Sequence, residues 1–222
     1  MPSQTLTGRR RLLALAPLAL PLLAAGCGSS SEPSLYTLTI KPGPVLQGGP
    51  PVVQLREIGL ARYLDRREIV RSSDGNRLDV AYNEWWGEPL GAMLARVLVV
   101  GLSQRLPGSS IYNETGAIAT DPNAVLAVNI QRLDVDKSGT LQLLAQAAVE
   151  FNRPRKSAAR TFSISRPVTA ATIAGHVAAA SEAVAELTDG FAAFLQSGRG
   201  RTRPWRARPR PPRPRPPRPS RR

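Results

Sequence analysis

Apolar residues recur along this chain with two different periods. Between Leu141 and Phe151 every second residue is apolar, which is the period of a strand with one buried face. Between Leu90 and Leu102, and again between Thr169 and Leu195, apolar residues recur every three or four positions, as on one face of a helix. These patterns predict an α+β fold, in which an antiparallel or mixed sheet carries two long helices on one side.

The expected sheet contains four further segments rich in strand-forming residues. Neighbouring strands are expected to be antiparallel, because their connections are too short for parallel crossovers. In the third segment the alternation changes phase by one residue, which predicts a bulge near Gln131 or Arg132. The four segments are Tyr36–Ile40, Val52–Ile58, Ala124–Asp136 and Arg160–Ser165.

A hairpin is predicted at Asp74-Gly75-Asn76, because glycine adopts positive φ without steric cost. After the hairpin, Pro89 suits the first turn of a helix, where its missing N–H removes no intrahelical bond. The apolar face of this first helix is expected to contain Leu90, Met93, Leu94, Val97, Leu98 and Leu102.

The second helix, Thr169–Leu195, carries apolar residues at heptad spacing. Packing on the sheet is the favoured interpretation, and a contact with a partner or with a second copy of the chain is the alternative. The heptad positions are Ile173, Val177, Ala180, Val184, Leu187, Phe191 and Phe194.

The N-terminus has the pattern of a secretory signal peptide, expected at residues 1–26. Arg9–Arg11 precede the apolar run Leu12–Leu23, which is shorter than the roughly 20 residues that span a bilayer. Small residues then lead to Cys27, a pattern that resembles the lipobox of bacterial lipoproteins. Cys27 is the only cysteine, so acylation is favoured over an incidental unpaired thiol. By the lipoprotein sorting pattern, Gly28 after the cysteine indicates the periplasmic face of the outer membrane.

The net charge of +14 resides outside the expected domain. Arg9–Arg11 contribute three positive charges, and residues 199–222 contribute eleven arginines and no acid. The remaining 16 basic groups balance the 16 acidic groups, so residues 27–198, which contain the domain expected at 35–198, carry no net charge. Residues 27–34 are expected to be a lipidated tether, of which Gly28–Ser34 reach at most about 25 Å, and residues 199–222 are expected to be a disordered Arg/Pro tail.

Three motifs occur in order around the hairpin. They are Tyr63-Leu64-Asp65-Arg66, Ile69-Val70 and Trp86-Gly87-Glu88-Pro89-Leu90. In these motifs the chain resembles the PqiC-type auxiliary lipoproteins of bacterial ABC-type transport systems, from about Leu35 to Leu195. Two departures are Ala61-Arg62, where the family usually has a proline, and Gly87, where alanine is more usual.

The resemblance implies a non-enzymatic, lipid-anchored accessory subunit that supports lipid transport between the inner and outer membranes. Its implied partners are an MCE-type periplasmic protein and, through it, an ABC transporter. The motif residues look architectural, and Trp85 is our candidate for partner docking beside a buried Trp86. The alternative is a free-standing envelope lipoprotein whose Arg/Pro tail binds anionic polymer or lipid; export argues against nucleic acid.

The sequence offers no set of residues for catalysis or for metal binding. His176 is the single histidine, and with Cys27 acylated no soft ligand cluster is left for zinc. A GxxxxGK[ST] motif is absent, so the chain is not the ATPase of its system. Asp134 and Asp136 share one face of a strand, where we expect them to be solvated. No cofactor is expected.

Overall fold

The computed structural model describes residues 32–72, 76–117 and 120–199. The predicted signal peptide, Cys27 and the Arg/Pro tail from residue 200 onward therefore lie outside the described residues, as do Asp74 and Gly75 of the predicted turn. The strands on either side of that turn, β4 (Glu68–Ser72) and β5 (Asp79–Trp86), pair antiparallel as the hairpin prediction requires.

The sheet is built around β7 (Ala124–Val135). Along one edge β7 pairs antiparallel with β8 (Thr140–Asn152), and β8 pairs antiparallel with β9 (Arg155–Pro167). Along its other edge β7 pairs in parallel with β2 (Val52–Leu55), β3 (Gly59–Leu60) and β4 in turn. The register shifts between Ile130 and Arg132, which confirms the predicted bulge.

Two short parallel strands complete the sheet within the described ranges. β1 (Ser34–Tyr36) pairs with β5, and β6 (Ser110–Asn113) pairs with β2. The sheet is therefore mixed, as the predicted fold class allows.

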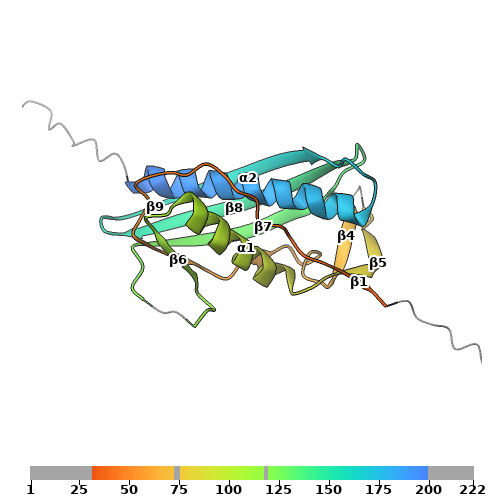
Figure 1. Cartoon of the computed structure of the whole chain (residues 1–222), viewed down its shortest axis with the longest axis horizontal. Coiled ribbons are helices and arrows are strands. Elements are labelled where there is room, and N and C mark those ends of the chain that lie inside the picture. Colours follow the sequence, from red (N-terminus) through yellow and green to blue (C-terminus); the bar gives the residue numbers. More distant parts are fainter. Residues whose placement is uncertain (1–31, 73–75, 118–119, 200–222) are drawn as a thin grey trace, which may run out of the picture. The chain divides into compact units, whose positions relative to one another are not determined.

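Both helices, α1 (Leu90–Arg105) and α2 (Ile173–Arg199), pack on the same face of the sheet (Figure 1). The alternating apolar side chains of β8 are buried beneath them, which removes their surface from water and stabilises the fold. All six residues predicted for the apolar face of α1 are buried. Neither helix of the described part is long and apolar enough to cross a membrane.

The strand predicted at Tyr36–Ile40 is wrong. β1 ends at Tyr36, and residues 37–51 run across the helices outside the sheet (Figure 1). Two of their backbone N–H groups bond to helix side chains instead of to a neighbouring strand. The Leu38 N–H donates to Met93 Sδ at 3.3 Å, and the Thr39 N–H donates to Ser181 Oγ at 3.1 Å.

Several element ends differ from the prediction for local reasons. Pro89 lies one residue before α1, at its N-cap, with φ −51°. α2 begins at Ile173 rather than Thr169, where Thr172 Oγ1 accepts the Gly175 N–H at 3.1 Å and so caps the helix. β2 ends at Leu55, before the predicted Ile58, and β9 is longer at both ends than the predicted Arg160–Ser165.

Candidate docking site

The Tyr63-Leu64-Asp65-Arg66 motif forms a tight turn between β3 and β4. The Leu64 N–H donates to the Ala61 carbonyl at 2.8 Å, and the Arg66 N–H donates to the Leu64 carbonyl at 2.9 Å. Leu64 is buried in the core, so this one side chain holds the turn against the sheet.

Tyr63 anchors the same turn to β7. Its hydroxyl donates to Asp134 Oδ2 at 2.7 Å, while Arg132 Nε donates to Asp134 Oδ1 at 2.9 Å. The expectation that Asp134 is solvated is therefore wrong, because the residue is 1 % exposed. The shift at Ile130 turns Asp134 toward the face away from the helices, where the Tyr63 turn covers it.

Asp136, by contrast, is partly exposed and holds the β7–β8 turn. Hydrogen bonds from the Ser138 hydroxyl, the Gln142 side chain and the Thr140 N–H lower the pKa of its carboxyl to about 2. The turn itself needs Gly139, whose φ is +76°. These contacts make Asp136 a structural residue.

Trp85 and Trp86 end β5, where the pairing with β4 is interrupted. Ala81 lies opposite Ile69 and Trp85 lies opposite Glu68, so residues 82–84 bulge out of the ladder. Trp86 is 9 % exposed, and its N–H donates to the Arg67 carbonyl at 2.7 Å.

Trp85 is half-buried at the surface. Its indole Nε1 donates to the Tyr82 carbonyl at 2.7 Å, and the Arg67 guanidinium lies 4.8 Å from the ring centroid, a cation–π contact. The two tryptophans thus have the relative exposure that the sequence predicted.

The remaining motif residues begin α1. Leu90 is buried. Glu88, just before the helix, accepts hydrogen bonds from Arg96, which lies nearly two turns into α1. Arg96 also donates to Thr37 Oγ1 at 3.1 Å. The contacts of Arg96 with Glu88 and Thr37 hold the chain after β1 against the first turns of α1.

A surface pocket of about 430 Å³ brings these elements together. It contains Trp85 and most of the motif residues, whereas Tyr63, Leu64, Ile69 and Val70 lie outside its lining. β1 forms one side, since Leu35 pairs with Trp85 and the Gly87 N–H donates to the Tyr36 carbonyl at 2.8 Å. The lining residues are Leu35, Asp65, Arg66, Arg67, Trp85, Trp86, Gly87, Glu88, Pro89 and Leu90.

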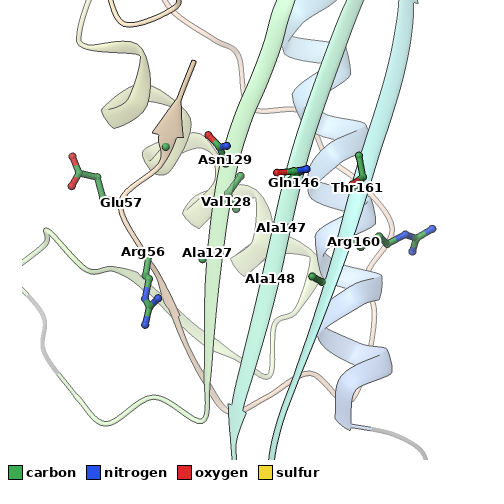
Figure 2. Close-up of a pocket in the computed structure, with 12 residues that line it drawn as sticks. Arg56, Glu57, Ala127, Val128, Asn129, Gln146, Ala147, Ala148, Arg160 and Thr161 are labelled. Atoms are coloured by element: carbon green, nitrogen blue, oxygen red, sulfur yellow. The ribbon is translucent and has the colours of Figure 1, made fainter. Parts of the chain in front are cut away.

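A second hollow of about 630 Å³ lies on the sheet face away from the helices (Figure 2). Its floor is a row of small residues across three strands, in which Ala127, Ala148 and Ala159 are register partners. Arg56 and Arg160 flank it, but Arg56 lies 4.0 Å from Glu150 and Arg160 lies over the Phe162 ring. A second row lies beside the alanines and lines the same hollow: Asn129, Gln146 and Thr161, which are register partners as well.

Sequence reasoning missed one buried ionic contact, between Arg105 of α1 and Asp189 of α2. Arg105 is 1 % exposed and also donates to the carbonyls of Gly101, Ala185 and Lys41. The available signal was its spacing, because Arg105 follows Leu98 and Leu102 on the buried face of the helix.

The described residues contain no group of three or more His, Cys, Asp or Glu side chains that could hold a metal ion. His176 is partly buried, and burial followed by the charge of Arg71 lowers its pKa. Its position beside Ile69, Trp86 and Val177 is a packing position, away from the pocket of Trp85.

A mixed sheet, two helices on one face and a surface pocket beside the first strand define an α+β domain. The chain belongs to the family described as ABC-type transport auxiliary lipoprotein component, whose model matches residues 36–192. The family is one of auxiliary, membrane-anchored proteins of the cell envelope, associated with ABC-type transport systems.

Two solved structures share the fold. A crystal structure titled only as that of an uncharacterized protein has a TM-score of 0.63 and 17% identity, and the match covers 74% of this chain and 99% of the other. The protein XCC0632 from Xanthomonas campestris has a TM-score of 0.61 and 19% identity, with 75% and 94% covered. No curated protein matches the chain.

Proposed function

We propose that this protein is a non-enzymatic accessory subunit of an MCE-associated ABC system that moves lipids between the inner and outer membranes. It is held at the periplasmic face of the outer membrane by acylated Cys27, and it docks an MCE-type periplasmic protein. The observation that carries the proposal is the family match over residues 36–192, which includes every motif residue of the pocket.

The docking surface of the proposal is the pocket around Trp85. Aromatic side chains that are partly exposed in a surface pocket are typical anchors of protein interfaces. The Trp85 ring is fixed by its hydrogen bond to the Tyr82 carbonyl and by Arg67, so little side-chain entropy is lost when a partner covers it.

The test is crosslinking in intact cells, followed by purification of the full chain from the membrane fraction. The expected result is an MCE-type protein crosslinked to the wild type, and loss of both membrane association and crosslink in Cys27→Ala. A chain that crosslinks to no MCE-type protein while anchored would contradict the proposal. Truncation after Gly198 tests the alternative, a free-standing lipoprotein that binds through its Arg/Pro tail. If the truncated chain no longer captures the partner, binding belongs to the tail.

A further inference from the structure

The point at which the tether enters the domain is known from β1. β1 begins at Ser34 and pairs in parallel with the end of β5, so that Leu35 lies beside Trp85. Cys27 precedes Glu32, the first described residue, by five positions, and five extended residues span at most about 18 Å. An acyl anchor on Cys27 therefore keeps the β1–β5 end of the domain close to the membrane.

Exposed apolar side chains gather at this same end. Leu35 is 66 % exposed and Tyr82 is 82 % exposed. Single exposed apolar residues are ordinary on a soluble surface, but these two flank Trp85: Leu35 is its strand partner, and the Tyr82 carbonyl accepts its indole N–H. Leu78, just before β5, is 45 % exposed as well.

The bulge of β5 explains why Tyr82 projects. Tyr82 falls outside the register of β5 with β4, so it leaves the ladder while its carbonyl accepts the Trp85 indole N–H. A phenol ring with an apolar body and a polar hydroxyl suits the boundary between lipid headgroups and acyl chains, where tyrosine is enriched.

Two arginines at this end are paired with acids, and a third lies over an aromatic ring. Arg71 lies 2.8 Å from Asp79, Arg66 lies 3.9 Å from Glu68, and Arg67 covers Trp85. What Leu35 and Tyr82 contribute at a membrane surface is the burial of their exposed apolar side chains.

We propose that the β1–β5 end rests on the membrane surface, with Leu35 and Tyr82 entering the boundary between headgroups and acyl chains. This proposal rests on the acyl anchor of the proposed function, and it adds how the domain is oriented on the membrane. α1, with 16 residues and a length of about 24 Å, leads away from this end toward Arg105. Docking through Trp85 would then take place at the membrane surface.

The test is site-specific photocrosslinking of the full, anchored chain in intact cells grown with radiolabelled phosphate, which labels phospholipid headgroups and not the acyl anchor on Cys27. Photoreactive p-benzoylphenylalanine replaces Tyr82 in one variant and Val45 in the control. Val45 is 60 % exposed and belongs to the segment whose Leu46 N–H bonds the Arg105 carbonyl, at the other end of α1. Both positions are exposed, so folding is kept.

After irradiation, we expect the variant at position 82 to carry phospholipid label. The variant at position 45 should carry no more label than an unirradiated sample. Equal labelling at the two positions, absence of lipid at position 82 in membrane-bound protein, or crosslinks from position 82 to protein alone would each overturn the proposal. Recovery of the wild type in the soluble fraction would instead contradict the anchor itself, so the two failures are distinguishable.

Discussion

Trp85 and Trp86 show how a change of one position decides the role of a residue. Successive side chains of a strand point to opposite faces. Trp86 therefore enters the core beside Ile69 and Val177, while Trp85 stays at the surface under Arg67. The difference in burial could be predicted from the sequence, but the contact partners could not, because Arg67 reaches Trp85 through strand pairing.

The first prediction concerns the stability contributed by Trp86. Trp86→Ala should lower the free energy of unfolding by about 3–5 kcal/mol, because the substitution leaves a cavity among buried side chains. Trp85→Ala should cost clearly less, since its ring is half-buried. Urea unfolding followed by circular dichroism measures both, and equal losses would show that Trp85 is also part of the core.

The second prediction concerns His176. Its Nδ1 is buried and has no hydrogen-bond partner among the described residues, and burial and Arg71 lower its pKa from the usual 6.5. The unfolded chain then binds a proton more readily than the folded chain. The free energy of unfolding should be highest above the unfolded-state pKa of about 6.5 and should fall as the pH drops from there toward the lower folded-state pKa.

Unfolding of the wild type and His176→Gln at pH 7.5 and 5.5 measures this effect. The difference between the two pH values should shrink in His176→Gln and persist in Asp136→Asn, because Asp136 titrates only below its ordinary pKa of 3.8. An unchanged pH dependence in His176→Gln would show that His176 is not the group responsible.

At the scale of elements, the ion pair of Arg105 and Asp189 joins the two helices and the segment after β1. Gly43 lies so close that an added Cβ would stand 2.3 Å from an Arg105 nitrogen. Glycine therefore permits residues 37–51 to lie over the pair. Arg105 is almost fully buried, whereas the Asp189 side chain is 38% exposed, so the cost of an unpaired charge falls on Arg105.

The third prediction follows from that asymmetry. Asp189→Leu should destabilise the protein by about 3–5 kcal/mol, because it leaves a buried guanidinium without its carboxylate. The double variant Arg105→Met with Asp189→Leu should recover most of that loss, since no buried charge is left. Additive losses in thermal unfolding would contradict a direct interaction between the two side chains.

The elements that sequence predicted well are those that bury one face over a long stretch. β7, β8, α1 and α2 each repeat their period several times, so both type and approximate ends are visible in the sequence. β3 and β6 were missed because two and four residues hold too few repeats. The path of residues 37–51 depends on helix side chains far away in the chain, such as Ser181.

The candidate site was predictable only in its parts. The motif residues and Trp85 were named from the sequence, but the pocket forms because β1 pairs in parallel with β5, some 50 positions later. The exposure of Tyr82 depends on the bulge of β5. Burial of Asp134 depends on the bulge of β7 together with Tyr63, and neither contact leaves a local pattern.

At the scale of the whole domain, the two ends of the described chain lie far apart. β1, β4, β5 and the start of α2 lie at one end, and α2 then runs 27 residues, about 40 Å, to Arg199 (Figure 1). The Trp85 pocket and the exposed Leu35 and Tyr82 are at the first end, where the described chain begins. In our account, the domain therefore acts at the membrane surface.

The most direct test of this account is partner capture by folded Trp85→Ala. The variant should remain anchored and folded, yet crosslink much less MCE-type protein than the wild type, as truncation of an interface aromatic weakens binding. Val45→Ala, which alters an exposed apolar residue at the other end of α1, should capture as much as the wild type. Undiminished capture by folded Trp85→Ala would contradict the account and place the docking face elsewhere.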